Sequence, residues 1–118
     1  MDVTEQEQVE KSIEISIEAA RGAINRRDAI QKLFKNKEFK MIFEELYFKE
    51  EPARLVALLT DDEFQTDERQ EGIRNDMLAI SGLRKFLMST QRIGNQMANA
   101  VASSEAELEA LRNEEEGE

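Results

Sequence analysis

The stretch that decides the fold runs from Asp67 to Arg112 and reads DERQEGIRNDMLAISGLRKFLMSTQRIGNQMANAVASSEAELEALR. It contains no proline, and nothing in it forces a helix to stop. Thr66 is a candidate N-cap, and the acidic residues Asp67 and Glu68 favour a first helical turn because they face the positive end of the helix dipole. We therefore predict a single helix over residues 67–112.

Seam positions recur in this helix with the seven-residue period typical of helices that pair lengthwise. One seam position is taken by Ile73, Ile80, Leu87, Gly94, Val101 and Leu108, and the other by Asp76, Leu83, Thr90, Met97, Ser104 and Leu111. Polar and small residues dilute the repeat at Asp76, Thr90, Gly94 and Ser104. The spacing still predicts one face that lies against another helix.

The length of this helix leaves two alternatives open. Its 46 residues would measure roughly 70 Å, whereas a compact domain of this size spans roughly 35 Å. Either the helix breaks, with Gly82 or Gly94 as the hinge, or its second half projects and meets a partner. We favour projection, because small residues and no aromatic follow Gly94. Gly94 and Ala98 would let a second helix approach closely, and a tight crossing inside the monomer would use them equally well.

The candidate partner-binding residues come from this face. They are Leu87, Gly94, Met97, Ala98, Val101, Leu108 and Leu111. Beyond them, residues 113–118 (NEEEGE) are expected to form a disordered acidic tail, because the segment has no apolar side chain to bury.

The amino-terminal part carries a second helical pattern. Val9, Ile13, Ile17, Ala20 and Ile24 follow one another at intervals of three and four, which places them on one stripe of a helix over about residues 5–33. Thr4 and Glu7 have the spacing of a capping box at its start. Residues 26–28 interrupt the stripe and leave a bend or break open.

Aromatic residues concentrate in the middle of the chain, where six of the seven fall between residues 34 and 64. We predict a helix over residues 37–50 with Asn36 as its N-cap. The helix has scarcely any polar face, so we expect it to be buried and the core to be built around it. Its apolar residues are Phe39, Met41, Ile42, Phe43, Leu46, Tyr47 and Phe48.

Pro52 is expected to start a short helix over residues 52–59 after a corner at Glu50 and Glu51. Within it, Arg54 either extends to solvent over a core or pairs with an acid such as Glu44, Glu50 or Glu51. Thr60 and Glu63 repeat the capping-box spacing, and residues 61–65 are expected to form a loop or one helical turn.

Composition sets the class of protein. The chain has 118 residues and a mass of 13.6 kDa, which suits one domain over residues 1–112. One proline and five glycines are too few for many short strands, so the fold class is all-α: a small helical bundle with a long C-terminal helix.

The absence of cysteine and histidine removes disulfides, thiolate and imidazole chemistry and the usual zinc ligands. The sequence also has no phosphate-binding loop and no nucleophile elbow, so we predict no enzyme and no catalytic, cofactor-binding or metal-binding residue. The longest apolar run, residues 55–59, is far short of the ~20 residues of a membrane span, and no signal peptide is recognised. A virion or the host cytoplasm is the expected location.

Charge is distributed in blocks. Residues 1–20 carry −5, 21–40 carry +5, 41–71 carry −7, 72–104 carry +3 and 105–118 carry −6, for a net charge of −10. Blocks of opposite sign suggest segments that lie side by side, within one chain or between copies, and equally describe solvated helix faces. A strongly acidic chain is not expected to bind nucleic acid as its main task.

Residues 36–89 show a set of helix-packing patterns. These are Asn36 to Phe39, the pair Tyr47 and Phe48, the run Ala53 to Val56, an acidic loop, and Asp76, Ala79, Ile80 and Leu83. In these patterns the chain resembles small helical proteins encoded among the structural genes of tailed bacteriophages. The resemblance implies a non-enzymatic protein of the head or tail module that works by contact.

Two functions follow as hypotheses. The first is a virion or assembly component that associates with itself or docks on a capsid, portal or tail protein. The second is an acidic, DNA-mimicking inhibitor that blocks a host nucleic-acid-binding protein by presenting carboxylates in place of phosphates. The basic blocks at residues 21–40 and 72–104 speak against a uniform mimic.

Overall fold

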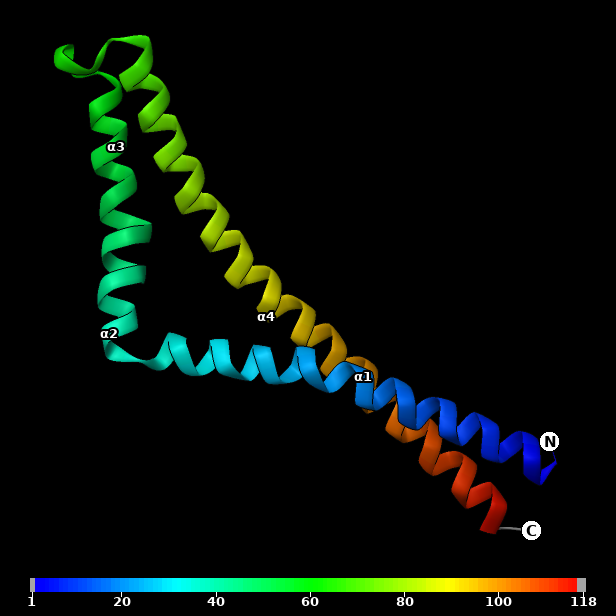
Figure 1. Ribbon diagram of the computed structural model, residues 1–118. Coiled ribbons are helices and arrows are strands. Elements are labelled where there is room, and N and C mark those ends of the chain that lie inside the picture. Colours follow the sequence, from blue (N-terminus) through cyan, green and yellow to red (C-terminus); the bar gives the residue numbers. More distant parts are fainter. Residues whose placement is uncertain (1, 117–118) are drawn as a thin grey trace. The chain divides into compact units, whose positions relative to one another are not determined.

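The computed structural model describes residues 2–116, a range that contains helices and short connections and no strand (Figure 1). The elements in chain order are α1 (Val3–Lys35), α2 (Lys37–Phe39), η1 (Lys40–Glu50), α3 (Glu51–Leu59), η2 (Asp62–Phe64) and α4 (Asp67–Glu116). The predicted all-α class with a long C-terminal helix is confirmed. Over the described range, no helix combines the length and the apolar character that crossing a membrane requires.

The described chain forms two compact units, and both α1 and α4 contribute to each of them. Unit 1 consists of residues 2–29 and 90–116, and unit 2 of residues 30–89. Unit 1 is a pair of helix segments, whereas unit 2 contains the shorter elements between α1 and α4.

Helix α1 starts earlier than the capping-box spacing predicts. Asp2 Oδ1 accepts a hydrogen bond from the backbone N–H of Glu5 at 2.8 Å, which is the geometry of an N-cap. The expected cap at Thr4 is therefore wrong, because Thr4 already lies inside the helix. The helix then continues through residues 26–28 without a break.

Helix α4 is continuous over its 50 residues and passes through both Gly82 and Gly94. A hinge at either glycine is therefore wrong; a helical glycine costs only ~1 kcal/mol, which the packing of a long helix readily offsets. At the start of α4, Thr66 Oγ1 accepts from the N–H of Arg69 at 3.3 Å, as expected of an N-cap. Residues 113–116, expected in the tail, continue the helix, and residues 117–118 lie outside the described range.

Unit 1 is an antiparallel pair in which the start of α1 runs beside the end of α4 (Figure 1). Gln6 Nε2 donates to the carbonyl oxygen of Leu111 at 2.8 Å, and Arg112 Nη2 lies 3.1 Å from Glu14 Oε1. The predicted α1 stripe forms the contact face, since all five of its residues are buried or half-buried. The buried apolar residues of unit 1 are Ile17, Ala20, Ala23 and Leu108.

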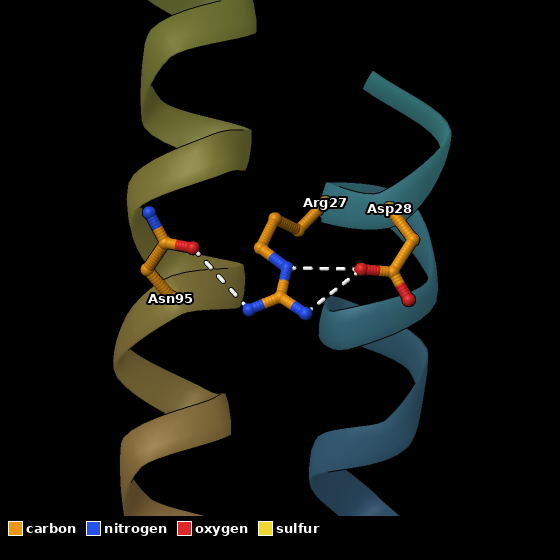
Figure 2. A network of polar contacts seen from close by, with 3 residues as sticks. All are labelled: Arg27, Asp28 and Asn95. Atoms are coloured by element: carbon orange, nitrogen blue, oxygen red, sulfur yellow. Dashed lines mark hydrogen bonds and ion pairs between the residues drawn. The ribbon is translucent and has the colours of Figure 1, made fainter. Parts of the chain in front are cut away.

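The two helices of unit 1 approach each other closely at Gly94. A Cβ placed on this glycine would lie 2.1 Å from Arg27 Cβ and 2.9 Å from the carbonyl oxygen of Ala23. The same crossing carries a polar bridge, because Arg27 Nη1 donates to Asn95 Oδ1 at 3.3 Å while Arg27 Nη2 donates to Asp28 Oδ1 at 2.8 Å (Figure 2). Gly94 thus serves a tight helix crossing inside the chain, the second of the two uses considered for it.

One carboxylate on α1, that of Glu10, is partly buried. Within the described residues, Glu10 Oε1 is buried without a hydrogen-bond partner. Because an unsatisfied buried acceptor is destabilising, Glu10→Leu is expected to raise the free energy of unfolding by about 1–2 kcal/mol. Urea denaturation followed by circular dichroism measures this change. Glu7→Leu, at an exposed position of the same helix, is the control and should change stability by less than ~0.5 kcal/mol.

Unit 2 is held together by a small core in which α3 packs against the first part of α4. Leu55 is 1 % exposed, Ile73 4 % and Ile80 6 %. Half-buried side chains complete the cluster: Tyr47, Phe48, Leu58, Leu59, Phe64 and Met77. The α4 side of this core follows the predicted seam, except that Met77 replaces Asp76, because burying a carboxylate is costly and Asp76 stays exposed.

The turn between α3 and α4 corrects another cap. Thr60 Oγ1 donates back to the carbonyl oxygen of Ala57 at 3.2 Å and so closes α3, while Asp61 Oδ1 accepts from the N–H of Glu63 at 2.8 Å and caps η2. The capping box of Thr60 and Glu63 is therefore wrong, because Thr60 belongs to the end of the previous helix. Of the loop or single helical turn expected at residues 61–65, the turn is found, as η2.

Candidate interaction surface

The segment from α2 to α3 is the most unusual part of unit 2. Asn36 caps it as predicted: its backbone is extended and its side chain accepts from the N–H of Phe39 at 2.8 Å. From there the backbone stays helical through α2, η1 and α3, with Glu50 and Glu51 both in the right-handed helical region. The corner predicted at Glu50 and Glu51 is therefore wrong.

Pro52 fits this continuous helix because η1 is a π-helix of 11 residues. Glu51 N–H donates to the carbonyl oxygen of Leu46, five residues back, so the turn is wider than in an α-helix. In a regular α-helix the proline ring would press on the carbonyl four residues before it. The change from π-helical to α-helical hydrogen bonding falls next to Pro52. Because proline has no backbone N–H, it has no donor to place in either hydrogen-bond pattern.

The wide turn also aligns side chains four residues apart, and aromatic rings exploit this alignment. Phe39 and Phe43 stack with centroids 4.9 Å apart, and Tyr47 meets Phe43 edge-on at 6.2 Å. Phe34 extends the row from the end of α1, 5.8 Å from Phe39, and Phe48 lies 5.6 Å from Tyr47. Such pairs contribute about 0.5–1.5 kcal/mol each, so the row stiffens η1 along its length.

One side of η1 is open, and two rings of the aromatic row, Phe43 and Tyr47, border it. No residue of η1 is buried, and Met41, Ile42 and Leu46 are 54 %, 46 % and 45 % exposed. The expectation of a buried helix at the centre of the core is therefore wrong. The segment is rich in large apolar side chains, as the sequence predicts, but the rest of unit 2 covers only part of its circumference.

A shallow groove of about 280 Å³ runs along this open side. It is lined by Ile42, Phe43, Leu46, Tyr47 and, at the start of α3, Glu51. We call these five residues, together with Met41, the η1 face. Four of the groove residues form two neighbouring rows of the helix, Ile42 with Leu46 and Phe43 with Tyr47, so the groove has the form that receives side chains of another helix.

Most of the large apolar side chains that are exposed lie in unit 2. Among the described residues, eleven large hydrophobic side chains are exposed, and eight of them lie in unit 2. Large contiguous apolar patches are rare on monomers and mark interaction sites. Three of the eight lie on η1 and three on α4, and of the eight only Ile42 and Leu46, both on η1, line the groove. The combination of exposed apolar side chains and a groove makes the η1 face the candidate interaction surface.

At the end of the groove, Glu51 is paired with Arg54. Arg54 Nε donates to Glu51 Oε2 at 3.0 Å, and Arg54 Nη2 donates to Glu51 Oε1. Of the alternatives considered for Arg54, pairing with Glu51 is the one found. The hydrogen bond lowers the pKa of Glu51 below its ordinary value of 4.5, opposed by loss of hydration and assisted by the charge of the guanidinium.

Replacing the arginine tests this assignment. In Arg54→Met, the pKa of Glu51 is expected to rise towards its ordinary value, because the hydrogen bond that favours the carboxylate is lost. A lowered folded-state pKa stabilises the fold above the unfolded-state pKa, and this contribution disappears as the pH falls through the lowered pKa. A carbon-detected NMR titration of the Glu51 carboxyl measures the change. An unchanged pKa in Arg54→Met would show that the pair does not form in solution; Arg74→Met is the control.

The seven residues predicted to bind a partner lie elsewhere and are largely covered. Leu87 in unit 2 is buried; in unit 1, Gly94 and Leu108 are buried, and Met97, Ala98, Val101 and Leu111 are half-buried. Gly94, which lies against Ala23, and Leu111, whose carbonyl oxygen accepts from Gln6, face α1 of the same chain. Their role in binding another molecule stays a prediction, and none of the seven is among the large hydrophobic side chains that are exposed.

Unit 1 carries a second groove of different chemistry. It has a volume of about 680 Å³ and lies between the start of α1 and the end of α4. Five carboxylates and two guanidinium groups line it: Glu14, Glu18, Glu105, Glu109 and Glu116 with Arg21 and Arg112. Across residues 2–116, no three or more acidic, histidine or cysteine side chains are placed to hold a metal ion.

Comparisons of the chain with protein-family models, with curated proteins and with solved structures gave no match.

Proposed function

We propose that this protein is a non-enzymatic assembly component that works through helix–helix contacts, of the kind found among the structural proteins of tailed phages. Its partners would be further copies of itself or a capsid, portal or tail protein. The observation that carries the proposal is the η1 face, where three large apolar side chains remain about half exposed beside a groove shaped for a helix. The phage setting rests on the resemblance of residues 36–89.

The proposal is tested in two measurements. Native mass spectrometry and light scattering of the full chain report self-association, and mass spectrometry of purified phage particles from the source reports incorporation. Self-association, incorporation or both are expected. A chain that is monomeric at every concentration and missing from the particles would overturn the proposal.

The acidic groove of unit 1 favours a second candidate, the inhibitor that mimics nucleic acid. Five carboxylates along one groove present the kind of negative surface that a nucleic-acid channel attracts, although the two arginines interrupt it. The expected result is displacement of labelled DNA from heparin-purified host proteins by the full chain, with an effect that weakens as salt is raised. Absence of displacement at low salt would exclude this candidate.

A further inference from the structure

We propose that the η1 face is the binding site for a second copy of this chain, with the two η1 helices antiparallel about a two-fold axis. The inference rests on the proposed function and names its partner and surface. A two-fold interface uses the same patch on both copies, so the patch must be complementary to itself in shape and in charge.

The shape condition is met by the two rows of the η1 face. Ile42 and Leu46 form an apolar row that is 46 % and 45 % exposed, and the groove lies between this row and the row of Phe43 and Tyr47. One element thus carries both a ridge and a groove. Packing the ridge of each copy into the groove of the other covers both rows at once, which is the usual way in which helices associate.

The charge condition is met only in the antiparallel orientation. Residues 35–40 carry a net charge of +2 and residues 44–51 a net charge of −3, with the apolar stretch Met41 to Phe43 between them. A parallel pair would place like charges together, whereas an antiparallel pair centred near Glu45 places the basic end of each helix beside the acidic end of the other. Lys40 of one copy then faces Glu50 of the other; both residues are exposed.

The first test introduces a charge into the face and into a matched exposed position. Sedimentation velocity of the full chain is expected to show a dimer. Ile42→Glu is expected to weaken dimerisation by about a hundredfold or more, because it places a carboxylate in the apolar contact. Ile15→Glu changes the same residue type at a site in unit 1 that is 61 % exposed, and it should leave the dimer intact. Circular dichroism confirms that both variants remain helical.

The second test fixes the orientation without touching the apolar contact. Lys40→Glu alone and Glu50→Lys alone should each weaken the antiparallel dimer about tenfold, because each variant brings like charges together twice. Mixing the two variants should restore dimers, since both charge pairs are then opposite again. In a parallel pair neither single variant would differ from the original chain, and that result would overturn the orientation.

Two other results would overturn this inference. One is a chain that stays monomeric up to about 1 mM, and the other is a dimer that withstands Ile42→Glu. Incorporation into purified particles by such a chain would leave the proposed function standing with another partner. If the chain neither dimerises nor is incorporated into particles, the proposed function itself is excluded. The failure of this inference and the failure of the proposed function are therefore distinguishable.

Discussion

Gly94→Ala is expected to lower the free energy of unfolding by about 2–3 kcal/mol, although alanine is the better helix former. The new methyl group would lie 2.1 Å from Arg27 Cβ and 2.9 Å from the carbonyl oxygen of Ala23. Neither atom is the free end of a flexible side chain, so α1 and α4 must separate at this crossing. Separation also disturbs the Arg27–Asn95 bridge, and the loss should appear as a lower midpoint in urea denaturation.

Two glycines of the same helix provide the matched control. A Cβ on Gly72 or on Gly82 would meet nothing within 4 Å. Gly72→Ala and Gly82→Ala are therefore expected to raise stability by about 0.5–1 kcal/mol each, because alanine restricts the unfolded chain. The opposite sign of the effect at Gly94 is the discriminating result. Stabilisation by all three substitutions would mean that the crossing is looser in solution than in the structure.

Gly94 also shows where sequence reasoning stops. A glycine at a seam position indicates that a helix passes close by, but the spacing does not say whether that helix belongs to the same chain. The antiparallel return of the chain decides it, and that return depends on all the elements between α1 and α4. The sequence therefore predicts the contact and leaves its partner open.

The seams themselves could be predicted because they depend only on local periodicity. The α1 stripe from Val9 to Ile24 is covered throughout, and so is the α4 seam from Ile80 to Leu111. Helix caps are harder to place, because several competent residues stand close together. Asp2 stands near Thr4 and Asp61 follows Thr60, and only the backbone geometry selects between the members of each pair.

The candidate site was missed for a different physical reason. Sequence reasoning treats an apolar helix as buried, since burial is the common fate of such helices in single chains. In η1 that inference assumes that the chain has enough neighbouring elements to surround the helix. The π-helical turn adds to the difficulty, because a pattern search at 3.6 residues per turn does not anticipate rows four residues apart that stay aligned. The row of Phe39, Phe43 and Tyr47 was the available indication.

Leu55→Ala is expected to cause the largest loss in unit 2, about 3 kcal/mol in the free energy of unfolding. Leu55 is 1 % exposed and lies in one cluster with Ile73 and Ile80. Removing its branched end leaves a cavity between α3 and α4 that a small core has little material to fill. Urea denaturation measures the loss, and amide exchange should report faster opening of α4 around Ile73.

The neighbouring residue makes the prediction specific. Val56 is 52 % exposed, so Val56→Ala should change stability by less than about 0.5 kcal/mol although it shortens a side chain on the same helix. Equal losses for the two variants would contradict the assigned core of unit 2. The test bears on the η1 face as well, because α3 continues η1 without a corner and Tyr47 and Phe48 pack on the Leu55 cluster. If Leu55→Ala destabilises unit 2 as expected, it should also weaken the proposed dimer, whereas Val56→Ala should not.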